Sequence, residues 1–317
     1  MNSTSIALIA LDWGTSNLRA SLLDHDGRPL ESRSAPGGVM AVQGGHFAAA
    51  LFALCGDWIV RHDCPLIASG MVGSRQGWRE APYLPCPATL TAAARQLTTI
   101  ELEVPGQTGA QRHLHIAPGL QCEDERGEAD VMRGEETQIW GAALPDGHCC
   151  VLPGTHSKWA WLGSAGEISR FCTYMTGELY GLLTRHGILG RLMQFDDTPA
   201  ALRREVFASG VQLGLAGHSQ LSHTIFAART AGLMGRVAPA ALPDYLSGIL
   251  IGAEIGVATQ GGVPPGPVTL IGDDDLCLRY EIALQIRGLA SARAPAGTTT
   301  SGQWKLAVAA GLMRPAP

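Results

Sequence analysis

Polar and glycine residues that can hold phosphate lie between two apolar runs near the start of the sequence, in the segment Ile6–Asp24. The residues of the polar turn are Gly14, Thr15, Ser16 and Asn17. Backbone amides and hydroxyl groups in such a turn could donate to phosphate oxygens, and Asp12, at the end of the first run, could hold a magnesium ion through water. Two strands joined by an ordinary polar hairpin would show the same pattern, so this segment alone leaves both interpretations open.

The segment 149–162 repeats this design, with an apolar run, a polar turn and a second run with alternating aromatic residues. The turn and the residue that follows it are Gly154, Thr155, His156, Ser157 and Lys158. Lys158 adds a positive charge where phosphate oxygens would lie. Two units of this kind suggest two halves that face a shared ligand. The sequence contains neither G-x-x-x-x-G-K-S/T nor the kinase pattern G-x-G-x-x-G, which excludes nucleotide sites of those two kinds.

The glycine-rich segment Gly70–Trp78 follows a short apolar strand and contains side chains that suit a sugar acid. These side chains are Ser74, Arg75 and Gln76. Arg75 could bind a carboxylate with two parallel hydrogen bonds, while Ser74 and Gln76 could bind hydroxyl groups. The alternative is a surface loop with a solvated arginine. Met71 and Trp78, which are costly to expose, favour a binding loop.

Asp130 stands at the start of a segment with helical composition, residues 130–143, and we expect it to be the N-cap of that helix. Arg133 follows about one turn later, and Glu135 and Glu136 come next. In a purely structural interpretation Asp130 caps the helix and both glutamates are solvated in its first turn, where negative charge is favourable. In an enzyme, Asp130 could be a general base beside an anion-binding arginine.

The run Val268–Gly272 is a predicted buried strand that ends in glycine before a predicted helix, Leu276–Arg287. Gly272 could let the backbone approach a nucleotide closely. The residues between strand and helix are Asp273, Asp274 and Asp275. Three carboxylates would repel phosphate, and they suit a ribose or a helix cap better.

Composition narrows the class of protein. A chain of 317 residues is long enough for two domains, and its net charge of −5, without a basic block, gives no reason to expect nucleic acid. The longest apolar run, Tyr245–Ala258, contains Glu254 and is too short to span a bilayer. The eight cysteines form no C-x-x-C pair or zinc-like spacing and are expected to be reduced thiols. We therefore expect a cytoplasmic protein without a membrane or nucleic-acid partner.

Hydrophobic periodicity predicts the elements that must position these segments. We expect an amphipathic helix over His46–Arg61, a short strand over Leu66–Ser69, a further strand over His113–Pro118 and a mainly helical chain beyond residue 200. Loops at the ends of strands are where α/β proteins bind their ligands, so the polar segments are placed as a binding site requires.

Several motifs together resemble those of the 2-dehydro-3-deoxygalactonokinase family, in the superfamily of sugar kinases, actin and heat-shock chaperone ATPases. The motifs are DWGTSNLRA (12–20), GMVGSRQGW (70–78), EAPYLPCPA (80–88), DVMRGEETQ (130–138), LPGTHSKW (152–159), TYMTGELY (173–180) and GILGRLM (187–193). They cover most of residues 6–193. The C-terminal third matches more loosely, because Asp273–Asp275 stand where small residues would be expected.

The resemblance implies an α/β protein with the two-lobed actin-like (ribonuclease H-like) sugar kinase fold, a mixed β-sheet in each lobe and a central cleft. We expect an N-terminal lobe over residues 1–128 and a C-terminal lobe over residues 129–317, whose last helix could pack back on the first lobe. The implied enzyme is a kinase that uses ATP and Mg2+ to phosphorylate the 6-hydroxyl of 2-dehydro-3-deoxy-D-galactonate. Its product, 2-dehydro-3-deoxy-6-phosphogalactonate, belongs to the catabolism of galactonate and galactose.

The resemblance also implies two phosphate loops. The first is Asp12 to Asn17, with Asp12 as the magnesium ligand, and the second is Gly154 to Ser157 with Lys158 as a catalytic cation. Gly272 would lie on the adenosine side of the nucleotide.

On the sugar side, the resemblance implies that Asp130 is the base that takes the proton of the 6-hydroxyl. Arg75 or Arg133 would bind the carboxylate of the sugar acid. The residues expected near its other polar groups are Ser74, Gln76 and Glu135.

Two alternatives stay open at this stage. The chain could phosphorylate another sugar acid, such as 2-dehydro-3-deoxygluconate, because one stereocentre cannot be inferred from loop sequences. It could also be an actin-like or chaperone-like ATPase that binds a protein partner, although the sequence contains no extra peptide-binding domain. A homodimer is compatible with the sequence.

Overall fold

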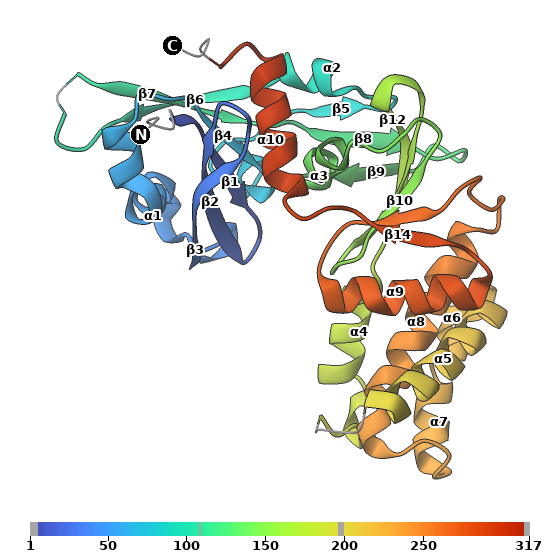
Figure 1. Ribbon diagram of the computed structural model, residues 1–317. Helices are drawn as coiled ribbons and strands as arrows, with labels where there is room; N and C mark the ends of the chain where they lie inside the picture. Colours follow the sequence, from blue (N-terminus) through green and yellow to red (C-terminus); the bar gives the residue numbers. More distant parts are fainter. Residues whose placement is uncertain (1–5, 108, 196–199, 314–317) are drawn as a thin grey trace. The chain divides into compact units, whose positions relative to one another are not determined.

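The computed structural model describes residues 6–107, 109–195 and 200–313, and its elements group into two compact units (Figure 1). Unit 1 consists of Met1–Asp146, Leu162–Phe171 and Pro295–Pro317, and unit 2 of Gly147–Trp161 and Cys172–Ala294. This division differs from the boundary expected between residues 128 and 129, because it keeps residues 129–146 with unit 1. Helix α3 (Glu135–Ala142) packs there against α10 (Thr298–Ala309), so contacts between distant parts of the sequence decide the division.

A six-stranded mixed sheet forms the centre of unit 1. Its strands, in spatial order, are β3 (Pro29–Pro36), β2 (Asn17–Asp24), β1 (Ile6–Trp13), β4 (Leu66–Ser69), β7 (Gln111–Ile116) and β6 (Thr98–Glu103). Strands β1, β4 and β7 are parallel, whereas β2 and β3 extend the sheet as an antiparallel meander. Helix α1 (Phe47–Arg61) leads to β4 and buries Leu51 and Trp58 in the same core as Leu11 and Trp13. The helix expected over His46–Arg61 is thereby confirmed.

Unit 1 also contains a small sheet and two helices that cross at close range. The small sheet has the order β5 (Tyr83–Pro85), β8 (Gly119–Glu123) and β9 (Ala129–Met132), and a short helix α2 (Leu90–Ala94) follows β5. Where α3 crosses α10, a Cβ at Gly302 would lie only 1.9 Å from the carbonyl oxygen of Thr137. Gln303 of α10 donates to the carbonyl of Leu11 at 2.6 Å, which anchors this C-terminal helix on β1.

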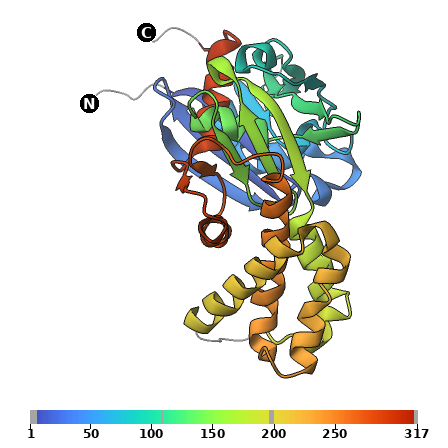
Figure 2. The same cartoon turned by 90° about the vertical axis from the view of Figure 1, so that its right-hand side faces the viewer.

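Unit 2 contains most of a five-stranded mixed sheet, because residues 162 and 168–171 of two of its strands fall in unit 1. The helices of unit 2 are drawn from yellow-green through orange to dark red in Figure 2. The strands, in spatial order, are β12 (Ile168–Tyr174), β11 (Ser157–Leu162), β10 (Cys149–Leu152), β13 (Val268–Leu270) and β14 (Ser291–Arg293). The helices are α4 (Thr176–Arg185), α5 (Ala200–Ala216), α6 (Leu221–Thr224), α7 (Ala227–Leu233), α8 (Leu242–Ala258) and α9 (Asp274–Arg287). The remaining described helical turns are of the 3-10 type: η1 (Val39–Ala41), η2 (Gln43–Gly45), η3 (Met71–Gly73), η4 (Ser164–Gly166), η5 (Leu189–Leu192), η6 (His218–Gln220) and η7 (Pro239–Ala241). A mixed sheet in each part of the chain agrees with the sequence prediction.

Glycines allow α5 and α8 to pack with their backbones in contact. A Cβ at any of four positions would lie 2.1–2.3 Å from a carbonyl oxygen of the opposite helix. The four positions are Gly210 and Gly214 in α5 and Gly248 and Gly252 in α8. The stretch Pro239–Ala258 is long and apolar enough to cross a membrane, yet 78% of its most apolar window is buried inside the structure, as is typical of a core helix.

Gly214→Ala is expected to lower the free energy of unfolding by about 1–3 kcal/mol, because the new methyl group would lie 2.1 Å from the carbonyl oxygen of Ile249 and force the helices apart. Gly181→Ala is the matched control, since it also lies inside a helix of unit 2 and a Cβ there would meet nothing within 4 Å. The control is expected to stabilise the protein by about 0.5–1 kcal/mol. Urea unfolding of both variants measures the effect, and equal stability of the two would contradict the close packing of α5 and α8.

Candidate active site

The first polar turn is a tight hairpin between β1 and β2, which confirms the predicted strand–turn–strand arrangement. The amide of Gly14 donates to the carbonyl of Asn17 at 3.0 Å, and Thr15, Ser16 and Asn17 are exposed. The loop before η1 supports the turn so closely that a Cβ at Gly38 would lie 2.3 Å from the backbone nitrogen of Ser16. Backbone contacts therefore hold the turn on one side and leave its polar side chains accessible.

Asp12 is the last residue but one of β1 and pairs with Arg19 of β2, whose guanidinium Nη1 lies 3.2 Å from its Oδ2. The side chain of Asp12 is 30% exposed. Burial raises the pKa of this carboxyl above its ordinary value, although the Arg19 charge acts in the opposite direction. No group of three or more His, Cys, Asp or Glu is placed to hold a metal ion within the described residues. A magnesium ion at Asp12 would need water or phosphate oxygens as its other ligands, which is the usual arrangement for Mg2+.

Three backbone segments of unit 1 meet beside Asp12, at two glycines. Gly70, directly after β4, has φ +94° and approaches β1 so closely that a Cβ would lie 2.9 Å from the carbonyl oxygen of Trp13. The same Cβ would lie 3.8 Å from Oδ1 of Asp12. Gly134, two residues after β9, has φ +109°, and a Cβ there would lie 3.1 Å from the Cα of Gly70. The chain around Gly134 is thereby brought to the segment that contains Asp12.

Asp130 does not cap α3, so the predicted N-cap is wrong. It lies in β9, opposite Cys122 of β8, and its Oδ1 accepts the amide of Val131 at 2.7 Å. Residues 129–132 pair with β8 and therefore stay extended, and α3 begins only at Glu135 with Gly134 as its N-cap. Four residues, 131–134, thus separate Asp130 from the helix that it was expected to start.

The two glutamates at the start of α3 have different environments. Glu135 is half-buried and its Oε2 accepts the amide of Arg133 at 3.0 Å. Glu136 is completely buried and accepts the amide of Gly134 at 2.7 Å and the hydroxyl of Thr137 at 2.9 Å. Burial, with a smaller contribution from the charge of Glu135, raises the pKa of Glu136 to about 7. The interpretation of both residues as solvated is wrong for Glu136.

Arg133 lies beneath the Gly70–Trp78 loop and is 8% exposed. Its Nη2 donates to the carbonyl of Ala81 at 2.8 Å, and its guanidinium carbon lies 4.2 Å from the ring centre of Tyr83. A Cβ at Gly73 would lie 3.0 Å from Nη1. The buried Nε and Nη1 atoms have no hydrogen-bond partner among the described residues. A buried cation with unused donors is costly unless an anion pairs with it.

The other residues predicted to bind the sugar acid lie in the same loop. Ser74 is buried, and its hydroxyl is also without a hydrogen-bond partner in the described part of the chain. Arg75 and Gln76 are exposed. Trp78 packs against Trp13, with ring centres 6.1 Å apart, and so fixes the end of the loop on the core. The structure therefore buries both Ser74 and Arg133, with Arg133 next to Gly73 of the loop, and leaves Arg75 at the surface.

The second polar turn joins β10 to β11 and rests on the first turn of α4. A Cβ at Gly177 would lie 2.4 Å from the carbonyl oxygen of Gly154, and the amide of Glu178 donates to the carbonyl of Thr155 at 2.9 Å. The carboxylate of Glu178 also bonds Nε2 of His156. Thr155 and His156 are exposed. The chain becomes buried directly after His156. Ser157 and Lys158 belong to β11 and are 0% and 4% exposed.

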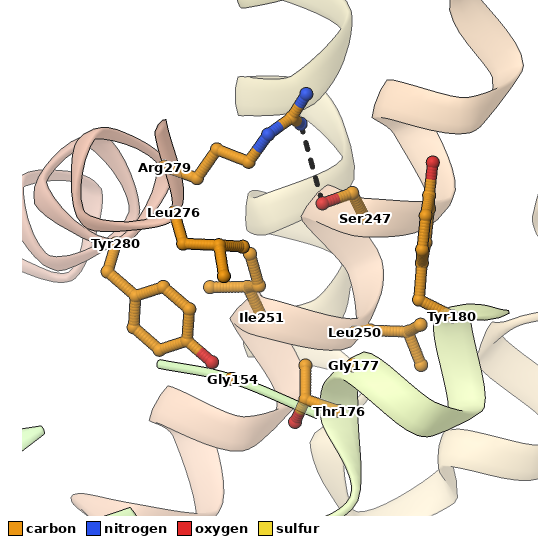
Figure 3. A pocket seen from close by; sticks show the side chains of 10 residues that line it. All are labelled: Gly154, Thr176, Gly177, Tyr180, Ser247, Leu250, Ile251, Leu276, Arg279 and Tyr280. Atoms are coloured by element: carbon orange, nitrogen blue, oxygen red, sulfur yellow. Dashed lines mark hydrogen bonds between the residues drawn. The ribbon is translucent and has the colours of Figure 1, made fainter. Parts of the chain in front are cut away.

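A pocket of about 140 Å3 lies beside the second turn, between α4, α8 and α9 (Figure 3). Gly154 forms one side, Thr176 and Tyr180 come from α4, and Leu276 and Arg279 come from α9. The lining is largely apolar, with a few polar groups, as in sites for small organic ligands. Arg279 is fixed at the rim by bonds to Ser247 (3.4 Å) and to the buried Asp244 (2.6 Å).

Gly272 lies against the residue that precedes the second turn, since a Cβ there would be 3.4 Å from the carbonyl oxygen of Pro153. The structure thus brings Gly272 and Gly154 to neighbouring positions. Asp273 caps α9 and accepts the amides of Asp275 at 3.0 Å and Leu276 at 3.3 Å. The interpretation of this acidic cluster as a helix cap is confirmed for Asp273.

Sequence reasoning missed a buried polar cluster behind the second turn. Glu254 of α8, Thr176 of α4 and Tyr280 of α9 are joined there by hydrogen bonds. Glu254 interrupts the apolar run Tyr245–Ala258, and a lone carboxylate within such a run was a signal that could have indicated a buried hydrogen-bonded role.

Comparisons with known proteins match most of the chain to one family. The model of the family described as 2-keto-3-deoxy-galactonokinase matches residues 12–306. The 2-dehydro-3-deoxygalactonokinase of Escherichia coli (strain K12) is 36% identical over 281 residues, which are 88% of this chain and 90% of that protein. A crystal structure of a Sinorhizobium meliloti protein provisionally identified as a 2-dehydro-3-deoxygalactonokinase has a TM-score of 0.82 and 33% identity, and it covers 96% of this chain and 95% of its own.

A more distant likeness supports the fold alone. Gluconate kinase from Lactobacillus acidophilus is 12% identical and has a TM-score of 0.50, with coverage of 97% of this chain and 90% of its own. The predicted sugar-kinase fold class is therefore confirmed.

Glu136→Gln is expected to change how stability depends on pH. The pKa of Glu136 is about 7 in the folded protein against an ordinary value of 4.5, so the unfolded chain loses this proton first as the pH rises. Wild-type protein should therefore lose stability between about pH 4.5 and pH 7 relative to Glu136→Gln, by up to about 3 kcal/mol. Urea unfolding of both proteins across this range measures the difference, and a difference that does not vary with pH would refute the raised pKa.

Proposed function

The chain belongs to the 2-keto-3-deoxy-galactonokinase family, and from this premise we propose that it transfers the γ-phosphoryl group of ATP to the 6-hydroxyl of 2-dehydro-3-deoxy-D-galactonate. The observation on which the proposal depends is the match of the family model to residues 12–306, because that range contains both polar turns, the Gly70–Trp78 loop and the start of α3. The product would be 2-dehydro-3-deoxy-6-phosphogalactonate, an intermediate of galactonate catabolism.

Unit 2 offers groups that suit the nucleotide. The exposed amides and side chains of Thr155 and His156 could donate to phosphate oxygens, and nothing lies within 4 Å of a Cβ placed at Gly154. The pocket beside Gly154 has apolar walls for a nucleoside and lies close to Gly272. Lys158, the second residue of β11, follows the turn directly and would add positive charge near the phosphates.

Unit 1 offers a second set of phosphate donors at Thr15, Ser16 and Asn17, together with Asp12 for a magnesium ion. The position of Asp12 fits this role because a Cβ at Gly70 would lie 3.8 Å from its Oδ1, so the glycine leaves space beside this oxygen that a side chain would fill. A magnesium ion held at Asp12 would supply charge neutralisation on the phosphates of the nucleotide. Asp12 would hold the ion next to the hairpin turn. The hydrogen bond from Arg19 would fix the side-chain conformation of Asp12.

Two carboxylates compete for the role of the base that accepts the proton of the 6-hydroxyl. Asp130 is the residue expected from the sequence, but it lies within β9 beside Cys122. Glu135 follows Gly134, whose backbone touches Gly70 next to Asp12, and an amide hydrogen bond from Arg133 orients its carboxylate. We therefore assign the base to Glu135 and treat Asp130 as the alternative.

Glu135→Gln is expected to lower kcat by about 10²–10⁴-fold with little change in sugar-acid binding, because the amide keeps the shape but cannot accept the proton. Asp130→Asn is the matched variant and is expected to keep kcat within about threefold of wild type. Steady-state kinetics of both variants decide between the two residues. A large loss in Asp130→Asn together with a small loss in Glu135→Gln would return the role to Asp130.

Arg133 is the better of the two arginines for the carboxylate of the sugar acid. Its buried Nε and Nη1 atoms have no partner among the described residues, and the equally unpaired hydroxyl of Ser74 lies in the adjoining loop, whereas Arg75 is exposed. Contact with the substrate requires a shift of the Gly70–Trp78 loop, since these donor atoms are enclosed. Glycine permits backbone conformations closed to other residues, so the loop could change shape while Trp78 keeps its end on the core.

Arg133→Met removes the charge and retains an apolar stem that can pack on Tyr83. It is expected to raise the apparent KM for the sugar acid about 10–100-fold, the usual effect of losing a hydrogen bond to a charged group, and to leave the KM for ATP nearly unchanged. Arg75→Ala should change both KM values less than about threefold. Equal effects of Arg133→Met on both substrates would contradict the carboxylate role.

The proposed reaction is tested by ADP release from ATP and Mg2+ with a panel of sugar acids. The proposal expects the highest kcat/KM with 2-dehydro-3-deoxy-D-galactonate. A higher value with 2-dehydro-3-deoxygluconate would establish the other sugar acid as the substrate. ADP release that requires an added protein or peptide, and no sugar acid, would instead identify a chaperone-like ATPase.

A further inference from the structure

Glu254 is a buried carboxylate to which the proposed chemistry gives no role. It lies four residues before the last residue of α8 and is 3% exposed. Four side chains donate to it: Ser157 at 2.8 Å and Trp159 at 2.8 Å to Oε1, and Tyr280 at 2.7 Å and Thr176 to Oε2. These donors come from β11, α9 and α4, so one side chain connects four elements of unit 2.

The four hydrogen bonds of the cluster all run from a donor to Glu254, which suits a carboxylate. Two carboxylate oxygens can accept four hydrogen bonds, whereas the amide of glutamine has one acceptor oxygen, and its NH2 group would reverse the direction of the bonds to Thr176 and Tyr280. Burial raises the pKa of Glu254, while the four hydrogen bonds lower it. A buried carboxylate with this number of donors is typical of a residue that fixes the positions of its partners.

Glu254 holds the end of the second turn through β11. Ser157 is the first residue of β11, directly after the exposed His156, and it is 0% exposed with its hydroxyl directed at Glu254. Trp159 lies two residues further and points to the same face of the strand, where its indole N–H donates to the same carboxylate oxygen. The exit of the turn is thereby fixed at two alternate residues of the strand, Ser157 and Trp159.

Glu254 also holds the turn through α4. Thr176, the first residue of α4, donates to Oε2, and the next two residues of the helix contact the turn directly. Gly177 lies against Gly154, and Glu178 bonds both the carbonyl of Thr155 and the ring of His156. The start of the turn and its exit therefore depend on one carboxylate.

Glu254 lies behind the pocket wall rather than on it. Thr176 and Tyr280 line the pocket next to Gly154 (Figure 3), but Glu254 is absent from the described residues that line it. An effect of replacing Glu254 on a ligand in this pocket would have to pass through the residues that it holds.

We propose that Glu254 is a positioning residue that fixes the nucleotide-binding conformation of the turn Gly154–Ser157. The proposal rests on the proposed function in that it takes the second turn to be a phosphate-binding loop. It adds a residue on α8 that selects the shape of this loop without touching the nucleotide.

The test uses Glu254→Gln and a matched pair of variants in α4. Thr176→Val removes one donor to Glu254, whereas Thr184→Val makes the same change in the same helix at a hydroxyl that bonds only the carbonyls of Tyr180 and Gly181 among the described residues. Thr176→Ser restores the hydroxyl. Calorimetric titration of each full-length protein with ADP gives the Kd, and thermal unfolding confirms that each variant is folded.

Glu254→Gln and Thr176→Val are expected to raise the Kd for ADP about tenfold or more, Thr176→Ser to stay near the wild-type value, and Thr184→Val to leave the Kd unchanged despite a lower Tm. The KM for the sugar acid should stay within about twofold in all four variants, a pattern that a general loss of stability would not produce. A wild-type Kd in Glu254→Gln, or equal weakening by Thr176→Val and Thr184→Val, would overturn the proposal.

Nucleotide binding by the wild-type protein also distinguishes failure of this proposal from failure of the proposed function. If the wild-type protein binds ADP but phosphorylates no sugar acid, the proposed function fails and the role of Glu254 is still decided by the variants. If the wild-type protein binds no nucleotide, both proposals are overturned.

Discussion

Close contact between backbones, possible only at glycine, is the constraint on which unit 1 depends. Gly70 and Gly134 both have positive φ angles. Because neither has a Cβ, the backbones at the ends of β1, β4 and β9 can approach one another closely. A methyl group at either position would be strained by its φ angle, and at Gly70 it would also meet the carbonyl oxygen of Trp13 at 2.9 Å. The polar residues next to these glycines, Asp12 and Glu135, owe their common location to this contact.

In unit 2, hydrogen bonds to a buried carboxylate fix the backbone of the second turn. Its second turn has few side-chain restraints of its own, and its conformation depends on α4, β11 and the carboxylate of Glu254 behind them. The glycines of α5 and α8 serve a different purpose, because they bring two helices into backbone contact and so fix the helix that contains Glu254. Close packing and a satisfied buried charge act together here, since a loosely packed α8 could not hold four donors in register.

Local patterns in the sequence were sufficient for the hairpin at Gly14–Asn17, the second turn at Gly154–Ser157 and helix α1, because each depends on residues close together in the chain. The N-cap expected at Asp130 was wrong because pairing with β8 outweighs a local preference for helix. The burial of Arg133 and Glu136, the division that keeps α3 with α10, and the bonds of Glu254 to Ser157 and Trp159 could not be predicted, since their partners are distant in sequence.

The central claim is that this chain places a phosphoryl group on one hydroxyl of a sugar acid. A two-dimensional 1H–31P correlation spectrum of the product formed from ATP and 2-dehydro-3-deoxy-D-galactonate tests it most directly, because the phosphorus couples most strongly to protons on the carbon whose oxygen carries the phosphoryl group. The account predicts a single phosphomonoester signal that correlates with the two protons at C6. A correlation with protons at another carbon, or inorganic phosphate as the sole phosphorus product besides ADP, would contradict it.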